Sequence, residues 1–411
     1  MAEKLDETKE REKKTGPKAL KGVRVLEMGS LIGGPFCGTL MAEFGAEVIK
    51  VEDPKVGDAQ RHFGKSVDNQ SLAFAYMARN KKCITIDLRV PEGQELFKRL
   101  IPFADVVIEN FRVGTLKGWS LDYNQLSQIN PRLIMNHVSG YGQYGPYKDR
   151  PAFDRIATAF SGQDFITGFP DKPPTRPGGA LADYITGLFG TIGTMFALYY
   201  RDVNGGKGQE IDLALYEGIF RCINQVEEHG EFGVVNQRMG NVNPYIAPAE
   251  TFVTKDGHWM VVHAATDNVW KRFVKVINRE DLDQDPKYNS QRARAKNQNE
   301  LHALIAEWIK QRSLEELTVI FEKAGIPATK VNSIADIFKD PHFQARENII
   351  DVLMHSGRKI KSVGIVPKLS LTPGQVKFVA PPLGAHNEEI YLNLLKLPRE
   401  EYENFKKRGI I

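Results

Sequence analysis

Apolar and polar positions alternate between strand-like and helix-like patterns along the first part of the chain. Residues 23–28 form a β-rich run, 36–44 follow a helical period, and 46–51 form a second β-rich run. This order indicates a βαβ unit, whose strands lie parallel with a right-handed crossover. Because the alternation continues, the sequence predicts an α/β domain with a mostly parallel sheet. The further predicted elements are strands at 82–87, 105–109, 133–138 and 209–213 and a helix at 91–103.

An uncharged stretch runs from Tyr184 to Tyr200, after a Pro-, Gly- and Asp-rich segment at 146–179 that is typical of loops. Its 17 residues are short for a membrane span, and Gly187, Gly190 and Gly193 interrupt it. The pattern therefore predicts a buried core helix with a face of small residues.

The pattern changes again near Pro248. Two β-rich runs flank a Lys255-Asp256-Gly257 turn, which predicts a hairpin. Helical periods follow, so we expect a smaller α+β domain here, preceded by a linker that shows little periodicity. From Ile349 the chain returns to strand and loop and ends in a helix. The predicted helices lie at 268–277, 297–312 and 314–323, and the predicted linker at 223–247.

Composition places the chain among ordinary soluble globular proteins. Its 411 residues are 42% hydrophobic and 26% charged, which excludes a disordered chain, a fibrous repeat and a disulfide scaffold. The net charge of +4 is weak evidence for nucleic acid, so we expect no such partner. Cys37, Cys83 and Cys222 have no CxxC spacing, and the N-terminus is charged rather than apolar. These features favour a cytoplasmic protein with no structural zinc and no membrane partner.

Glycines after the first predicted strand raise the question of a nucleotide. The loop reads Gly33-Gly34-Pro35-Phe36-Cys37-Gly38, which lacks G-x-G-x-x-G spacing, and Pro35 removes an amide donor. We therefore expect no NAD(P), although a helix N-terminus here still favours an anionic ligand. The nine histidines are scattered, so no metal site is predicted.

Asp183 stands immediately before the uncharged helix and has two interpretations. Aspartate is a preferred helix N-cap, which is the simpler role. It is also ionised at neutral pH and needs no base to act as a nucleophile. Attack on a thioester would give a mixed anhydride that keeps the acyl group activated. One residue can serve both roles, because helix amides stabilise a developing oxyanion.

An ordered set of motifs over about 20–411 resembles the type III CoA-transferases, which include formyl-CoA, carnitine and bile-acid CoA-transferases. No single motif carries the resemblance, but their order along the chain is highly specific. The matching residues are Gly33-Gly34-Pro35-Phe36-Cys37, Phe44 through Glu52, Asn80 through Leu88, Glu109-Asn110-Phe111, Gly140 through Tyr147, Phe153-Asp154, Leu181-Ala182-Asp183, Gly206 through Gln209, Arg238 through Asn241, Gly325-Ile326-Pro327, Asp340-Pro341, and Pro381 through Gly384 with His386.

The resemblance implies an α/β fold with a Rossmann-like large domain formed by both chain ends, a smaller central α+β domain, and an interlocked ring-like dimer. The implied boundaries are a charged tail at 1–20, the large CoA-binding domain at 21–222, the linker at 223–247, the small domain at 248–345, and a return to the large domain at 346–411. The partners would be an acyl-CoA, a small carboxylic acid and a second subunit, identical or related.

The resemblance also implies site residues. Asp183 would be the covalent nucleophile, passing from an aspartyl anhydride to an aspartyl-CoA thioester that an acceptor carboxylate attacks. CoA is then a substrate, with no permanently bound cofactor and no metal. Succinyl-CoA is the expected donor, and the acceptor is a dicarboxylic, hydroxy or carnitine-like acid. The implied CoA contacts are Ile32, Gly33, Ile86, Arg89, Asn110 and Phe111.

Departures from the family pattern leave alternatives open. Lys117 is expected to replace an arginine that aligns with Gly118, and Asp53 stands where relatives often carry arginine. Ile32 replaces the glutamine of the oxalate-handling branch, so oxalate and formate are not expected. An α-methylacyl-CoA racemase would need histidine in place of Phe153 to exchange a proton. The catalytic subunit of a heteromeric transferase, a CoA-binding protein and a thioesterase also remain possible on sequence alone.

Overall fold

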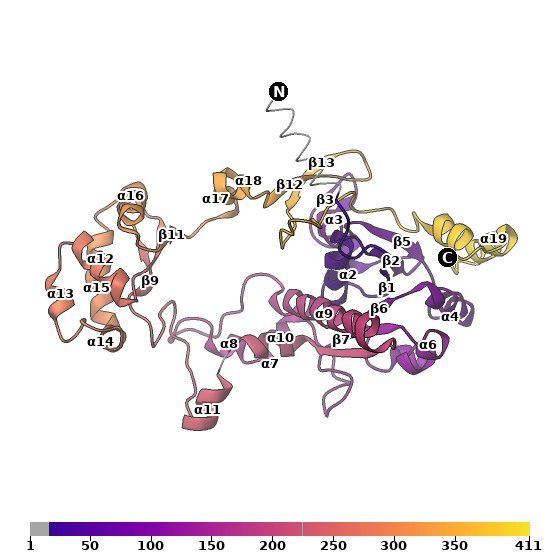
Figure 1. Ribbon diagram of the computed structural model, residues 1–411, viewed down its shortest axis with the longest axis horizontal. Helices are drawn as coiled ribbons and strands as arrows, with labels where there is room; N and C mark the ends of the chain where they lie inside the picture. The colour runs from indigo at the N-terminus through magenta and orange to yellow at the C-terminus, as the bar shows by residue number, and fades with distance from the viewer. Residues whose placement is uncertain (1–15, 224) are drawn as a thin grey trace. The chain divides into compact units, whose positions relative to one another are not determined.

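The computed structural model describes residues 16–223 and 225–411, so 1–15 of the predicted charged tail lie outside the described part (Figure 1). The chain forms two units. The larger comprises the chain up to Gln163 together with Pro177–Glu227 and His342–Ile411, and the smaller comprises Asp164–Arg176 and Glu228–Pro341. The smaller unit thus takes in 164–176, which the sequence analysis assigned to the large domain.

A six-stranded sheet with the order β5-β2-β1-β6-β7-β8 forms the centre of the larger unit, and every neighbouring pair is parallel. The predicted parallel α/β sheet is therefore confirmed. The chain adds strands first on one side of β1 and then on the other, which makes the β1–β6 boundary a topological switch point, where ligands of such sheets bind. The strands are β1 (Arg24–Glu27), β2 (Glu47–Glu52), β5 (Lys81–Thr85), β6 (Val106–Glu109), β7 (Ile134–Ser139) and β8 (Glu210–Ala214).

Successive residues of each strand enter two different cores, as a period of two requires. Val25 packs on the face covered by α2 and α9, whereas Leu26 packs on the opposite face with α4, α6 and α19. The second core contains Tyr391 and Tyr402 near the C-terminus, and the Tyr391 hydroxyl donates to the Thr85 carbonyl at 2.7 Å. Both ends of the chain thus build one hydrophobic core. The helices are α2 (Gly33–Glu43), α4 (Pro91–Lys98), α6 (Tyr123–Ile129), α9 (Leu181–Tyr199) and α19 (Arg399–Lys407).

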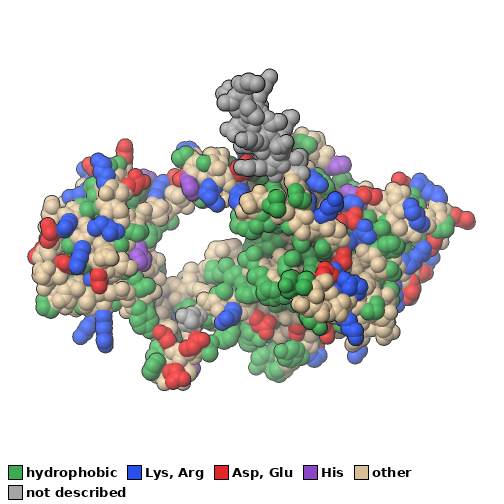
Figure 2. All heavy atoms as spheres, in the orientation of Figure 1, with side chains coloured by type: hydrophobic (Ala, Val, Ile, Leu, Met, Phe, Trp, Pro, Cys, Tyr) green, Lys and Arg blue, Asp and Glu red, His purple; other side chains and the backbone are tan. Residues whose placement is uncertain are grey.

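Small residues let α9 approach α2 closely, as the glycine pattern predicted. A Cβ added at Gly187 would lie 2.9 Å from Phe36 Cβ, so any larger residue would push the helices apart. The expectation that the whole helix is buried was wrong, because its opposite face exposes Leu188, Ile192 and Phe196. Figure 2 shows hydrophobic side chains gathered over α9. Among the described residues, Leu181–Gly205 is the one helix whose length and composition would suffice to cross a membrane.

The smaller unit contains the predicted hairpin. Strands β9 (Ala249–Val253) and β10 (Trp259–His263) pair antiparallel around the Asp256-Gly257 turn, and β11 (Ala328–Lys330) extends the sheet. The apolar faces of three helices pack around Trp270 and Phe273. These helices, each predicted from its period, are α12 (Asp267–Val276), α15 (Gln298–Ile309) and α16 (Leu314–Ala324). The predicted linker contains a helix, α11 (Val226–Phe232).

The remaining elements are short. They are the strands β3 (Ser66–Val67), β4 (Gln70–Ser71), β12 (Ile349–Leu353) and β13 (Lys359–Val363), and the helices α3 (Leu72–Met77), α5 (Thr115–Gly118), α7 (Asp154–Phe160), α8 (Gln163–Ile166), α10 (Leu215–Cys222), α13 (Asp281–Gln284), α14 (Gln291–Lys296), α17 (Ile334–Lys339) and α18 (Pro341–Ala345). Two 3-10 helices, η1 (Ala59–His62) and η2 (Ile101–Phe103), and two π-helices, η3 (Tyr200–Gly205) and η4 (Glu389–Leu394), complete the elements of the described residues.

Candidate active site

Asp183 lies in the first turn of α9 and lines a cavity of about 350 Å³ in the larger unit. The first turn of α2 faces it, since a Cβ added at Gly33 would lie 3.4 Å from Asp183 Oδ1. Gly33 therefore leaves space beside the carboxylate, and the backbone amides of a helix start favour negative charge there. The cavity combines an anionic side chain with a helix end suited to stabilise an oxyanion.

The carboxylate that caps α9 belongs to Asp154 rather than to Asp183. Asp154 Oδ1 accepts hydrogen bonds from the backbone nitrogens of Ala182 at 2.7 Å and Asp183 at 3.3 Å. The N-cap interpretation of Asp183 was therefore wrong. Among the described residues, none donates a hydrogen bond to the Asp183 carboxylate, so the group is available for chemistry.

Burial raises the pKa of Asp183 to about 7, and the negative charge of Asp154 adds to this effect. Removing a carboxylate from water disfavours its ionised form, and so does a like charge beside it. A raised pKa makes the ionised carboxylate more basic than a surface aspartate. Perturbed groups of this kind concentrate at functional sites, which supports a chemical role for Asp183.

The loop between β1 and α2 forms one wall of this cavity and is held by two side chains. Asn110 accepts from the Ser30 nitrogen at 2.8 Å and donates to the Ser30 carbonyl at 2.7 Å. Asp58 Oδ1 accepts from the Ser30 hydroxyl at 3.0 Å and from the Leu31 nitrogen at 3.1 Å. Asn110, which was predicted to contact CoA, holds the loop through this amide and also lines the cavity, so the CoA contact stays a prediction.

A buried charge network in the protein interior supports this loop. Lys50 Nζ lies 3.0 Å from Glu27 Oε1 and 2.6 Å from Asp58 Oδ2, and Lys81 Nζ lies 2.7 Å from Glu27 Oε2. All four side chains are almost completely buried. Although burial opposes the charge of Lys50, the two carboxylates outweigh it and raise its pKa. Sequence reasoning missed this network. Its signal was Glu27 and Lys50 inside the apolar strands predicted at 23–28 and 46–51, since charged side chains there are expensive to bury unpaired, whereas Lys81 precedes the strand predicted at 82–87.

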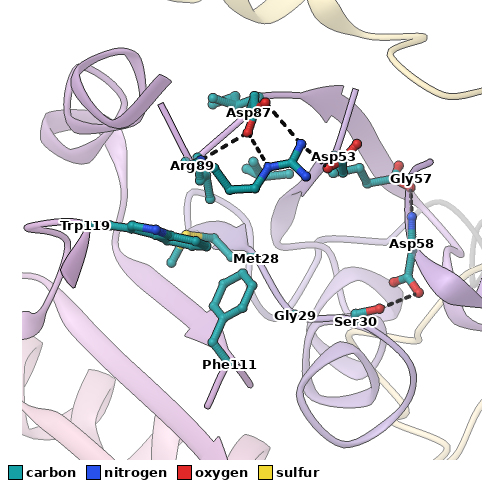
Figure 3. Close-up of a pocket in the computed structure, with 14 residues that line it drawn as sticks. Met28, Gly29, Ser30, Asp53, Gly57, Asp58, Asp87, Arg89, Phe111 and Trp119 are labelled. Carbon is teal, nitrogen blue, oxygen red and sulfur yellow. Dashed lines mark hydrogen bonds and ion pairs between the residues drawn. The ribbon is translucent and has the colours of Figure 1, made fainter. Parts of the chain in front are cut away.

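A second pocket of about 240 Å³ lies at the carboxyl ends of β1, β2 and β5 (Figure 3). Phe111 and Trp119 form one side, with ring centroids 5.2 Å apart. On the other side the Arg89 guanidinium lies 2.7 Å from Asp87 and 2.6 Å from Asp53. Ser30 and Phe111 line both this pocket and the cavity of Asp183. The two spaces are therefore neighbours with a shared wall.

The buried side chain of Glu109 also holds the backbone of Phe111. Glu109 Oε2 accepts from the Phe111 nitrogen at 2.7 Å, and Glu109 Oε1 lies 2.6 Å from His137 Nδ1. Burial opposes protonation of His137, but its hydrogen bond to Glu109 outweighs burial and raises the pKa of the imidazole. This pair was not identified from the sequence.

The predicted site residues thus divide into three groups. Asp183 shares its cavity with Ile32, Gly33, Asn110 and Phe111, whereas Ile86 and Arg89 join Phe111 in the second pocket. Lys117 is exposed on α5 and lines neither space. The cations Arg112, Lys148 and Arg150, which sequence reasoning did not single out, also line the Asp183 cavity. Among the described residues, no cluster of three or more His, Cys, Asp or Glu is placed to hold a metal ion.

Comparison with known sequences gives full-length matches. Residues 20–387 match the model of CoA-transferase family III. The chain is 42% identical over 397 residues to succinyl-CoA–D-citramalate CoA-transferase of Chloroflexus aurantiacus, covering 96% of this chain and 98% of that enzyme. It is 34% identical over 388 residues to succinate–glutarate CoA-transferase of Agrobacterium fabrum, covering 92% and 96%.

Solved structures show the same fold. A CaiB/BaiF family protein from Brucella suis superimposes with a TM-score of 0.81 at 35% identity, covering 92% of this chain and 99% of that protein. A protein from Mycobacterium tuberculosis superimposes with a TM-score of 0.81 at 26% identity, covering 91% and 100%. These similarities extend over both units of the chain.

Proposed function

Since this chain belongs to CoA-transferase family III and is an enzyme that transfers CoA, we propose that it moves CoA from succinyl-CoA to a small carboxylic acid through covalent intermediates on Asp183. The observation that supports this route most is the carboxylate of Asp183. Among the described residues, none donates a hydrogen bond to this carboxylate, because Asp154 caps α9 in its place. The carboxylate lies in a cavity that shares a wall with a second pocket, whose aromatic rings and arginine suit a nucleotide. Several relatives are named as succinyl-CoA or succinate CoA-transferases, which supports succinyl-CoA as the donor.

In the proposed cycle, an oxygen of ionised Asp183 attacks the thioester carbon of succinyl-CoA. The carbon–sulfur bond breaks, CoA leaves as thiolate, and an aspartyl–succinyl anhydride remains. The thiolate then attacks Cγ of Asp183, which releases succinate and leaves an aspartyl-CoA thioester. The acceptor carboxylate attacks Cγ in turn, the carbon–sulfur bond breaks, and CoA leaves as thiolate from an aspartyl–acceptor anhydride. The thiolate then attacks the acceptor's carbonyl carbon, which forms the new acyl-CoA and releases Asp183 as its carboxylate. Backbone amides at the start of α2 would stabilise the oxyanions.

We place the nucleotide end of CoA in the second pocket. Phe111 and Trp119 offer aromatic faces for adenine, and Arg89 offers a cation for a phosphate. Asp53, which stands where relatives often carry arginine, holds Arg89 by an ion pair. Asp87 pairs with the same guanidinium, so a phosphate binds Arg89 in competition with two carboxylates that orient it.

The racemase alternative is disfavoured by Phe153. This residue lines the cavity of Asp183 at the position where a racemase needs histidine, and a phenyl ring carries no exchangeable proton. Asp154 is not among the residues that line this cavity, and its Oδ1 accepts from the start of α9. Two transferable protons, one for each face of the α-carbon, are not available among these residues.

For assembly and location we propose a cytoplasmic homodimer of interlocked subunits. The exposed apolar face of α9, which includes Leu188, Ile192 and Phe196, would be covered by a second copy. A heteromer is the alternative, since relatives include the alpha and beta subunits of succinyl-CoA–L-malate CoA-transferase. All three cysteines are unpaired, as is common in a reducing compartment.

A panel of acids tests the proposed function directly. With succinyl-CoA as donor, we expect new thioesters of dicarboxylic or hydroxy acids and release of succinate in equal amount, measured by chromatography with mass detection. Acid-independent hydrolysis of succinyl-CoA would instead indicate a thioesterase. Exchange of the α-proton of a 2-methylacyl-CoA would indicate a racemase.

The raised pKa of Asp183 predicts the pH dependence. Because the nucleophile must be ionised, kcat/KM should rise with pH through a midpoint of about 7 and level off above it. Asp154→Asn removes the neighbouring negative charge but keeps an oxygen that accepts from the α9 amides. The variant should shift this midpoint to lower pH, while burial keeps it above that of an exposed aspartate. An unchanged midpoint in the variant would show that Asp154 does not act on Asp183.

A further inference from the structure

Resting on the proposed function, we infer that Arg112, Lys148 and Arg150 form a subsite for the second, non-reacting carboxylate of a dicarboxylic acid, with Arg150 as its main ligand. All three residues line the cavity of Asp183. Arg112 follows β6, whereas Lys148 and Arg150 lie in the segment that follows β7. Two separate parts of the chain therefore bring cations to the same space as the nucleophile.

The segment that carries Lys148 and Arg150 is held at the cavity by close contacts. Gly140 follows β7 and has no side chain, and a Cβ there would lie 2.6 Å from Ala152 Cβ. The Asp212 carboxylate accepts from the Gln143 nitrogen at 2.9 and 3.0 Å, which fixes the turn between these positions. The cationic segment therefore has a defined place beside the cavity.

The arginines keep their charge available for a ligand. Arg150 stacks on Tyr147, with its guanidinium carbon 3.6 Å from the ring centroid, and has no carboxylate within ion-pair distance among the described residues. Stacking fixes the plane of the guanidinium and leaves its N–H groups free to bind a carboxylate in the two-pronged geometry that arginine favours. Arg112 likewise has no ion-pair partner in residues 16–223 and 225–411, whereas Lys148 pairs with Asp149 at 3.0 Å.

The charge balance of the cavity favours a dianionic acid. Its lining contains three cations and two carboxylates, Asp149 and Asp183, so positive charge is in excess along the lining, and Asp154 adds one negative charge behind Asp183 at the start of α9. Asp183 loses its own charge whenever it is acylated, which increases the excess during each cycle. An acid with a second carboxylate supplies the missing negative charge at the end away from the reacting carbon, and a monocarboxylic acid does not.

Paired acceptors test this subsite. Glutarate and pentanoate have the same chain, and differ in whether a carboxylate or a methyl group ends it. We expect the wild type to favour glutarate, and Arg150→Gln to reduce the ratio of kcat/KM for glutarate to that for pentanoate by about 10-fold to 100-fold. Arg112→Gln should reduce it less, and Arg150→Lys should restore part of it. Arg99→Gln is the control, because it removes an exposed arginine that pairs with Glu401 and lines neither space.

Other outcomes have distinct meanings. A ratio unchanged by Arg150→Gln overturns the subsite. Equal loss for both acids with a raised KM for succinyl-CoA also overturns it, because the cations then bind CoA phosphates. If the wild type transfers CoA to no acid of the panel, the proposed function fails. Calorimetric binding of glutarate then still decides the subsite: equal affinity in the wild type and in Arg150→Gln contradicts it, and at least about 10-fold weaker binding in the variant supports it.

Discussion

Asp183→Asn is expected to reduce CoA transfer by about 10,000-fold or more, because the amide has nearly the same shape as the carboxylate but cannot act as a nucleophile. The loss should appear in kcat with succinyl-CoA and any acceptor acid, while the affinity for CoA changes little. Asp351→Asn is a suitable control, since it removes an exposed carboxylate on β12 that pairs with Lys361. Transfer by Asp183→Asn within about 10-fold of wild type would contradict a covalent role for this residue.

The same variant should not lose stability. Asp154, not Asp183, caps α9, so no cap is removed. The folded protein also keeps the Asp183 proton up to a pH of about 7, well above the ordinary value of 3.8. Between these two values the folded state binds more protons than the unfolded chain, so this group lowers stability as the pH rises. Asp183→Asn should therefore be more stable than wild type above about pH 7, as measured by denaturant unfolding, and equal to it in acid.

Lys50→Met is expected to lower the free energy of unfolding by about 3 to 5 kcal/mol, because it leaves Asp58 buried without its cation and Glu27 with only one. Asp58 also holds the loop at Ser30 and Leu31, so the variant should bind CoA more weakly as well. Unfolding in urea, monitored by circular dichroism, measures the first effect, and calorimetry measures the second.

Lys82→Met provides the matched control on a neighbouring strand. Lys82 pairs with Glu47 and Glu389, but its side chain remains 26% exposed, and partly exposed ion pairs contribute about 1 kcal/mol or less. If Lys50→Met cost no more than Lys82→Met, the buried network would not support the fold in the way described. If Lys50→Met is destabilised but binds CoA as tightly as the wild type, the buried network stabilises the fold without holding the loop for CoA binding.

The sequence predicted the elements of the sheet well because their apolar runs are short and clearly bounded. The strands expected at 23–28 and 46–51 appear as β1 and β2, and they pair in parallel with Leu26 opposite Ile49. The prediction for α9 was only half right. Its glycines correctly indicated a close helix contact, but apolar composition does not show whether the opposite face meets the protein, a second subunit or solvent.

The candidate site was harder to predict, because its geometry depends on residues far apart in sequence. Asp154 lies well before Asp183, and only the folded chain brings its carboxylate to the start of α9. Asn110 was expected to contact CoA, and the sequence did not show that its amide also pairs with Ser30. A motif identifies which residues matter more readily than it identifies which atom each of them contacts.

Asp53 illustrates the same limit for electrostatics. The sequence showed only an acid where relatives often carry arginine, which left the phosphate contact in doubt. The structure shows that Asp53 and Asp87 both pair with Arg89, so the two acids orient this cation but also offset its charge, and the phosphate contact stays a prediction. Lys117, expected to provide a substitute cation, lies outside both spaces.

The most direct test of the account is a search for the covalent intermediate. The enzyme is incubated with succinyl-CoA, treated with borohydride, digested, and analysed by tandem mass spectrometry. We predict that Asp183 is converted to homoserine, as expected when an aspartyl thioester or anhydride is reduced, and that the peptide containing Asp154 is unchanged. An unmodified Asp183 in enzyme that is turning over at full rate would contradict the central claim.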